Sequence, residues 1–244
     1  MYPDVGLFIV ADGVGGHQSG KQASSLTVTA IRESLLTQTE DDLTPVTDDA
    51  GNASIEGRRL VLAIQDANDR VHRAGQAQGS KRMSSTVAAL LFDLENELLA
   101  VAHVGDSRVY RVRNGHIEQL TEDHTLVREF VKEGRLSPEE ARESPHRHYI
   151  TQAIGSESVV TPSLRLDRIA LQDVYVLCSD GVHDVVDDAE IAAIAGAHPR
   201  RLDDACARLI DLANERGGRD NSTVVLVACA AGDGDGRDAA AEND

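Results

Sequence analysis

The chain has 244 residues with a formal net charge of -17, and it is 41% hydrophobic, 27% charged and only 3% aromatic, with no tryptophan. This is an ordinary globular composition, long enough to bury a sizeable core. It argues against nucleic acid and anionic membranes as partners, because binding to them needs clustered Lys and Arg or stacking aromatic rings.

No export or membrane segment is predicted. No basic region precedes the first apolar residues, and the longest apolar run, VVLVACAA at residues 224–231, falls well short of the ~18 residues of a membrane helix. Cys178, Cys206 and Cys229 are widely spaced in apolar segments without a CxxC pair. We therefore expect free thiols and a cytoplasmic location.

Strand and helix patterns alternate along the chain. Asn114-Gly115 lies between two strand patterns and predicts a type I′ hairpin, hence antiparallel pairing. The pattern as a whole predicts an α+β fold, with sheets packed together and helices outside. The predicted strands are residues 7–11, 85–92, 98–104, 108–112, 164–169, 174–178 and 223–229, and the predicted helices start after Ser19, near Leu60, near Asp188 and at Leu202.

Three segments lack a regular pattern. Residues 38–57 are acidic and rich in turn formers, and residues 121–149 hold a short helix signal, SPEE at 137–140, within a polar excursion typical of a flap beside a site. Residues 232–244 form an acidic stretch that we expect to be disordered. One domain over residues 1–231 is therefore predicted, followed by a tail.

Aspartates recur at strand ends. Asp12, Asp106 and Asp180 follow apolar strands, and Asp220 precedes one. A single Asp-Gly after a strand is usually only a turn. Strand ends on one rim of a sheet can converge, however, and four carboxylates close together cannot all stay ionised without a cation. Oxygen ligands suit Mg²⁺ or Mn²⁺, and a pair of such ions can promote attack of water on a phosphate ester.

A nucleotide-binding loop is the competing interpretation of the same region. Gly15 and Gly20 are separated by four residues and followed by Lys21, which comes close to the P-loop pattern. Gln22 stands where that pattern needs the hydroxyl of Ser or Thr to bind Mg²⁺. The P-loop interpretation also leaves the other strand-end aspartates without a role, so it is disfavoured.

Several stretches together resemble the metal-dependent protein phosphatase 2C family of Ser/Thr phosphatases, in particular its bacterial branch. They occur in the family's order and extend over most of residues 7–229. The stretches are VADGVGGHQSGKQAS, MSSTVAALL, VAHVGDSRVYRVRNGHIEQLTEDHT, ITQAIG, VLCSDGVHDVVDDAEI and GGRDNSTVVLV.

The resemblance implies a four-layer α/β/β/α sandwich of two mainly antiparallel sheets flanked by helices, with a mobile flap at residues 121–149. It implies that Asp12 bridges two catalytic Mn²⁺ or Mg²⁺ ions, that the Gly13 carbonyl binds one of them, and that Asp180 and Asp220 complete the shell of the other. Asp106 matches a ligand of a third, weaker ion, which also uses Asp180.

The resemblance leaves the roles of the histidines and flap arginines open. His17 is either part of the loop structure or a proton relay. His124 fits a structural role, and Arg108 fits a structural ion pair better than a substrate contact. A solvated loop is favoured over contact with a phosphorylated substrate for four flap residues, which are Arg142, His146, Arg147 and His148.

Two roles of the family have no counterpart here. In the family, an arginine that grips the substrate phosphate and a glutamate that binds a metal lie upstream of the first aspartate, where this chain has only MYPDVGLF. The substrate-binding residues are therefore unassigned, an edge strand of the sheet is expected to be missing, and either an upstream start or a variant site explains the difference. Lys21 also departs from the family, which usually has an acidic residue there.

The sequence thus predicts a metal-dependent phosphatase acting on phosphoserine and phosphothreonine in protein substrates of a Ser/Thr kinase, through metal-activated water. The alternative is a pseudophosphatase, a regulatory module that binds phosphoproteins without turnover.

Overall fold

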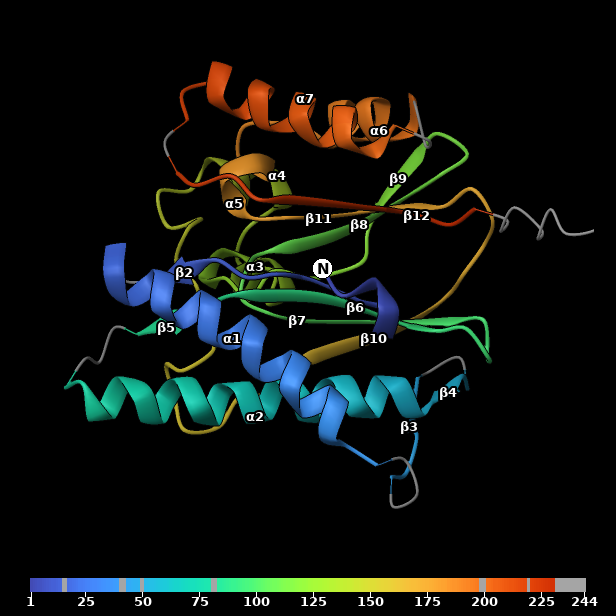
Figure 1. Cartoon of the computed structure of the whole chain (residues 1–244). Coiled ribbons are helices and arrows are strands. Elements are labelled where there is room, and N and C mark those ends of the chain that lie inside the picture. The colour runs from blue at the N-terminus through green and yellow to red at the C-terminus, as the bar shows by residue number, and fades with distance from the viewer. Residues whose placement is uncertain are drawn as a thin grey trace, which may run out of the picture.

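Two antiparallel sheets stacked face to face make up the centre of the protein. The computed structural model describes residues 1–14, 17–39, 43–48, 51–79, 83–197, 201–218 and 220–230. The strand orders are β1-β6-β7-β10 in the first sheet and β12-β11-β8-β9 in the second. Helices α1 and α2 cover the first sheet, and α6 and α7 cover the second (Figure 1). The predicted α/β/β/α sandwich is confirmed.

The elements have the following bounds. The strands are β1 (Leu7–Val10), β2 (Gly13–Val14), β3 (Val46–Thr47), β4 (Ala53–Ser54), β5 (Ser84–Ser85), β6 (Val87–Asp93), β7 (Leu98–Val104), β8 (Arg108–Arg113), β9 (His116–Gln119), β10 (Ser163–Arg168), β11 (Val174–Cys178) and β12 (Val224–Ala228). The helices are η1 (Pro3–Val5), α1 (His17–Thr37), α2 (Ile55–Ala77), α3 (Leu126–Lys132), α4 (Pro138–Glu143), α5 (Asp180–His183), α6 (Asp188–Ala197) and α7 (Leu202–Glu215).

Strand β6 shows how the layers are built. Alternate side chains of a strand point to opposite faces of its sheet. Val87 and Ala89 pack with the apolar residues under α1 and α2, whereas Ala88 and Leu90 pack in the cluster between the two sheets. Because both faces of β6 are buried, its sequence is a continuous apolar run and not an alternating one.

Local signals placed several elements correctly. Asn114 and Gly115 both have positive φ, 51° and 77°, and join β8 to β9 as the hairpin that the sequence predicts. The helix predicted near Leu60 is α2, and Leu60, Ile64, Ala67 and Val71, spaced by three or four residues on one face of it, are fully buried. After α7, the amide of Gly218 donates to the carbonyl of Ala213 at 3.3 Å, so the pair Gly217-Gly218 caps the C-terminal end of this helix.

Two boundaries differ from the prediction. The expected strand over residues 85–92 is interrupted at Thr86, and Ser84–Ser85 pairs instead with β2 in a separate small sheet. The segment 38–57, predicted to be irregular, contains the β3–β4 hairpin and the start of α2. That helix starts at Ile55 because the hydroxyl of Ser54 accepts the amide of Gly57, a cap whose spacing in the sequence went unnoticed.

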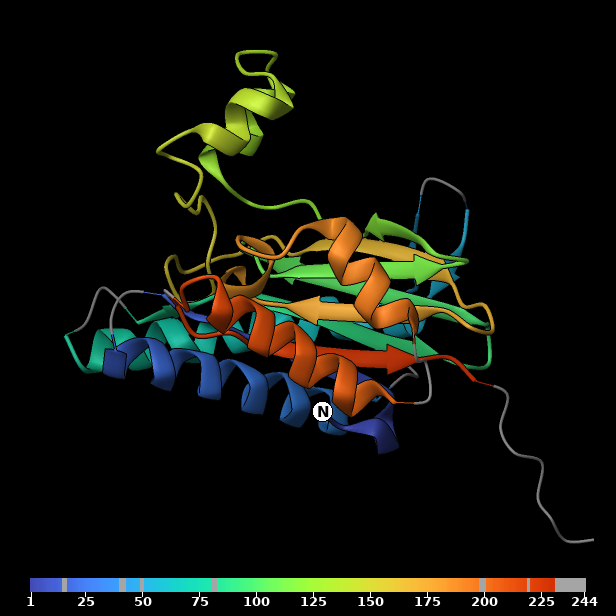
Figure 2. The ribbon, with the colours of Figure 1, turned by 90° about the horizontal axis from the view of Figure 1, so that it is seen from above.

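The flap stands apart from the sandwich. Helices α3 and α4 project away from the sheets, at the end of the molecule where α5 lies (Figure 2). Helix α4 begins with a capping box in which Ser137 and Glu140 bond each other's backbone amides, as the SPEE signal suggests.

The predicted tail at residues 232–244 lies outside the described residues. Strand β1 is an edge strand whose only strand partner in the described ranges is β6. None of the described helices has both the length and the apolar character that crossing a membrane requires.

Candidate functional site

Four aspartates meet at one end of the sandwich. Asp12 follows β1 and Asp106 follows β7, while Asp180 begins α5 directly after β11 and Asp220 lies before β12. The carboxyl groups of Asp12 and Asp180 share a hydrogen bond, and Asp180 also interacts electrostatically with Asp106 and Asp220. The structure therefore brings together all four residues that the sequence singled out, while their role as metal ligands stays a prediction.

Burial and neighbouring negative charges raise the pKa of three of these aspartates, Asp12, Asp106 and Asp180. Burial, followed by the charge of Asp180, raises the pKa of Asp12 to about 7. Burial and the same neighbour raise the pKa of Asp106 to about 7. Burial and the charge of Asp220 raise the pKa of Asp180. The site is thus poised to release protons when a cation compensates the negative charge.

Thr86 connects two of these aspartates. Its hydroxyl accepts the amide of Asp12 at 3.0 Å and shares a hydrogen bond of 2.7 Å with the hydroxyl of Ser107, the residue after Asp106. Both hydroxyl residues are 1% exposed. This pair, which the sequence analysis missed, ties the loop after β1 to the loop after β7. The signal available was the polar SST triplet at the start of an apolar strand.

Gly13 permits a close approach of backbone segments. A Cβ at Gly13 would lie 2.2 Å from the backbone of Gly20 in α1, so any side chain at this position would push the helix away from the loop that carries Asp12. This packing explains the glycine independently of the predicted role of its carbonyl, which no contact tests.

The loops of Asp180 and Asp220 are joined in a similar way. A Cβ at Gly181 would lie 2.5 Å from the carbonyl oxygen of Asn221, and the hydroxyl of Ser222 donates to the Gly181 carbonyl at 3.0 Å. The start of α5 at Asp180 is therefore held in contact with the segment that carries Asp220.

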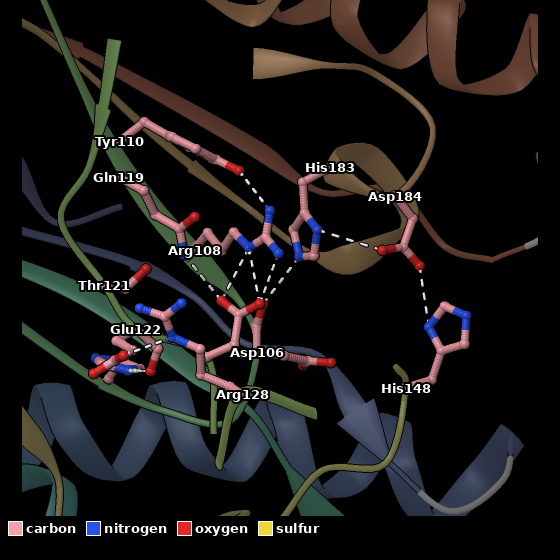
Figure 3. Close-up of polar contacts among 12 residues, drawn as sticks. Asp106, Arg108, Tyr110, Gln119, Thr121, Glu122, Arg128, His148, His183 and Asp184 are labelled. Atoms are coloured by element: carbon pink, nitrogen blue, oxygen red, sulfur yellow. Dashed lines mark hydrogen bonds and ion pairs between the residues drawn. The ribbon is translucent and has the colours of Figure 1, made fainter. Parts of the chain in front are cut away.

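A chain of contacts links the flap to Asp106 (Figure 3). His148 Nδ1 lies 3.2 Å from Asp184 Oδ2, and Asp184 Oδ1 lies 3.5 Å from His183 Nδ1. His183 Nε2 is 2.9 Å from the carbonyl oxygen of Asp106 and donates to it. His148 is thus more than a solvated flap residue. His183 and Asp184 were missed because the sequence shows only a short polar stretch after Asp180.

Burial keeps the bridging histidine neutral. The side chain of His183 is 3% exposed, and burial, reinforced by the charge of Arg108, lowers its pKa to about 3. A neutral ring that donates from Nε2 has only a lone pair at Nδ1, and this atom has no hydrogen-bond partner among the described residues.

The remaining candidates fall into structural and exposed groups. Arg108 forms an ion pair with Asp123 at 2.7 Å, as expected. His124 accepts the amide of Gly105 and contacts the hydroxyl of Ser163, which confirms a structural role. Burial lowers its pKa to about 4. The side chain of His17 lies outside the part of the chain that the structure describes, and Arg142, His146 and Arg147 are exposed on the flap.

A cavity of about 950 Å³ lies between the flap and helices α5 and α6. Asp106 and Arg108 line it on the side of the aspartates, and Arg142 and Arg147 line it on the flap. The cavity, which is large enough for part of a larger molecule, therefore adjoins the aspartate cluster at Asp106.

Comparison with known proteins adds a family match. The sequence pattern of the family described as protein phosphatase 2C matches residues 2–221. A putative protein phosphatase 2C-type of Streptococcus pyogenes is 39% identical over 221 residues, which are 91% of this chain and 85% of the relative. Protein phosphatase PhpP of Streptococcus pneumoniae is 34% identical, over 91% of this chain and 85% of its own length.

Solved structures agree. The serine/threonine phosphatase PstP/Ppp of Mycobacterium tuberculosis superposes with a TM-score of 0.78 at 34% identity, covering 92% of this chain and 88% of that one. The catalytic domain of PstP in complex with two manganese ions superposes with a TM-score of 0.73 at 33% identity, covering 90% and 86%.

Proposed function

Because the chain belongs to the protein phosphatase 2C family, we propose that it is a serine/threonine protein phosphatase whose active centre holds two Mn²⁺ or Mg²⁺ ions. The observation that carries the proposal is the convergence of Asp12, Asp180 and Asp220, each of which comes from a different part of the chain. Carboxylates without neighbouring thiolates are the donor set that hard dications prefer.

The residues fit such ions. One oxygen of Asp180, Oδ1, is buried and has no hydrogen-bond partner in the described part of the chain. Besides burial, the charge of Asp180 raises the pKa of Asp12, and the charge of Asp220 raises the pKa of Asp180. We propose Asp12, Gly13, Asp180 and Asp220 as ligands of two ions, with Asp106 and Asp180 holding a third, weaker one. Ions of this kind supply Lewis-acid activation of water and neutralise the phosphoryl oxygens.

The chain's own residues hold this centre in place. Thr86 and Ser85 bond the amide and the carbonyl of Asp12, so the loop that carries this carboxylate is fixed before any ion binds. Near neutral pH, Asp12 and Asp106 are partly protonated, so ion binding displaces protons. His17, at the start of α1, is the candidate for relaying a proton to the leaving group.

Phosphorylated proteins are the proposed substrates, in particular the products of a Ser/Thr protein kinase. A reducing cytoplasm is the proposed location. The three cysteines support this location, because all of them are free thiols.

Hydrolysis of a phosphothreonine peptide tests the function. We expect phosphate release that requires Mn²⁺ or Mg²⁺, stops in EDTA and is abolished in Asp180→Ala, whereas Asp211→Ala on the exposed face of α7 retains it. Tight peptide binding without any turnover would favour the pseudophosphatase. Absence of both binding and turnover would contradict both functions.

A further inference from the structure

The cavity beside the aspartates is placed to hold the residues that flank a bound phosphoresidue. Its volume of about 950 Å³ is near the upper end of ordinary ligand pockets, which reach about 1,000 Å³. Asp106 and His148 line the cavity, and ligand atoms of His148, Asp180 and Asp184 lie within 4.8 Å of one another. The cavity and the aspartate site are therefore contiguous.

Most of the arginines that line this cavity already have acidic partners. Arg108 pairs with Asp123, Arg128 with Glu122, and Arg216 with Glu190.

Two flap arginines differ from these. Arg142, in the last turn of α4, and Arg147, beyond its end, line the cavity, and their side chains form neither a hydrogen bond nor a salt bridge with the residues that the structure describes. Both are exposed. The lining as a whole carries six acidic side chains and five arginines, and Arg142 and Arg147 are the arginines on its flap side that have no acidic partner at salt-bridge distance among the described residues.

The acidic residues across the cavity are better compensated. Asp187 accepts the amide of Glu190 at 2.9 Å, and Asp188 lies in the first turn of α6, where the helix dipole favours a negative charge. Asp184 contacts His148 and lies within electrostatic reach of Arg147. Arg142 and Arg147 therefore leave positive charge on the flap side of the cavity, which favours an anionic group there.

We infer that Arg142 and Arg147 bind acidic residues flanking the phosphorylated residue, so that the enzyme prefers phosphoproteins with Asp or Glu near the phosphorylated site. This inference rests on the proposed function, because it needs the phosphoryl group to lie at the aspartate cluster. A guanidinium group suits the task since its N–H donors match the two oxygens of a carboxylate.

The expected size of the preference follows from solvent exposure. An exposed pair between Arg and a carboxylate changes affinity by about 1.5- to 5-fold. Two such pairs give an overall preference of about 2- to 25-fold for acidic over neutral flanks, and added salt weakens it.

Three phosphothreonine peptides that differ only in their flanks, with Glu, Gln or Lys on both sides, test the inference. Hydrolysis gives kcat/KM, and fluorescence anisotropy of labelled peptides with a phosphonate in place of the phosphate gives binding whether or not turnover occurs. The proteins are the unmodified chain, Arg142→Gln, Arg147→Gln and the double variant. Lys132→Gln is the matched control, because Lys132 is a flap cation that pairs with Glu122 and does not line the cavity.

We expect the Glu peptide to bind most tightly and be hydrolysed with the lowest KM, and each arginine variant to lose about 1.5- to 5-fold of that preference. Hydrolysis of a small aryl phosphate should be unchanged, and Lys132→Gln should behave like the unmodified chain. Equal binding of the three peptides would overturn the inference while leaving the proposed function intact, as would a preference that survives in the double variant. A proportional loss on the aryl phosphate would also overturn it, by showing that the arginines support the fold of the flap.

Discussion

Thr86 and Asp12 hold each other through two hydrogen bonds. The amide of Asp12 donates to Thr86 Oγ1 at 3.0 Å, and the amide of Thr86 donates to the carbonyl of Asp12 at 2.7 Å. Because the same hydroxyl also contacts Ser107, beside Asp106, a single buried side chain sets the separation of two candidate ligands. The strand predicted over residues 85–92 is interrupted at Thr86, the residue that makes this connection.

Thr86→Val should separate the hydrogen bonds of the Thr86 hydroxyl from the packing of its side chain. The substitution keeps the shape but leaves the amide of Asp12 without its side-chain acceptor, and a buried unpaired group costs about 1 to 3 kcal/mol. We expect a loss of that size in the free energy of unfolding measured by urea denaturation, together with weaker Mn²⁺ binding. Thr29→Val is the control, since the hydroxyl of Thr29 bonds only the carbonyl of Ser25 on the exposed face of α1. Equal effects of the two substitutions would contradict the connecting role.

Asp12→Asn should stabilise the protein in EDTA, in a manner that depends on pH. The folded pKa of Asp12 is raised to about 7 from an ordinary value of 3.8, so between these values the folded state keeps a proton that the unfolded state releases. The unmodified chain therefore loses stability relative to the variant as pH rises from about 4 to about 7, and the difference is constant above that range.

Urea unfolding in EDTA at several pH values measures this difference. Comparing the two proteins removes the opposing contribution of the neutral histidines, His124 and His183, which is the same in both. Asp211→Asn, on the exposed face of α7, should show no such trend. A stabilisation that is the same at pH 4.5 and pH 8 would mean that Asp12 is not crowded by its neighbours.

Much of the fold could be predicted because local and tertiary preferences agree. The boundaries of β7 and β11 match the predicted ranges 98–104 and 174–178, since these strands are buried along their whole length and are almost entirely apolar, with His103 as the exception in β7. Thr86 was assigned to a strand because its β-branched side chain favours one, yet its hydroxyl bonds the loop of Asp12. Contacts between distant segments override local preference at such positions.

The candidate site could be predicted only in part. The strand-end aspartates were visible because carboxylates stand out after apolar runs. His183 was not, because its function depends on reaching the carbonyl of Asp106, 77 residues away in the chain, and no spacing in the sequence encodes that contact. Nothing in the sequence indicates that the side chains of Arg142 and Arg147 lack acidic partners. That difference is visible only in the structure, where the partners of the other arginines beside the cavity can be identified.

Asp180→Asn should abolish the thermal stabilisation by Mn²⁺. If free Mn²⁺ is about 100 times the dissociation constant, binding stabilises the folded state by about 2.7 kcal/mol. For a chain of this size, that raises Tm by about 5 to 11 °C. We expect this shift in the unmodified chain and in Asp211→Asn, but little shift in Asp180→Asn, which should be no less stable than the unmodified chain in EDTA because one repelling charge is gone. A full shift in Asp180→Asn would remove Asp180 from the ligand set.

A double-mutant cycle at Arg108 and Asp123 should show strong coupling. The Arg108 guanidinium contacts both oxygens of Asp123, and the two side chains are 22% and 15% exposed. Arg108→Gln or Asp123→Asn leaves a mostly buried charge unpaired, which we expect to cost about 2 to 4 kcal/mol, somewhat below the cost at a fully buried pair. The double variant should lose less than the sum, with a coupling energy of about 1 to 3 kcal/mol in urea unfolding.

The pair of Arg135 and Glu133 on the flap is the control for that cycle. These side chains are 59% and 57% exposed and lie 3.1 Å apart, so their coupling should stay below about 1 kcal/mol. If the losses in the free energy of unfolding at Arg108 and Asp123 were additive, the two side chains would not stabilise each other, and each would instead be stabilised by its other contacts. In that case Arg108, which also lines the cavity beside Asp106, would become a candidate for contact with substrate.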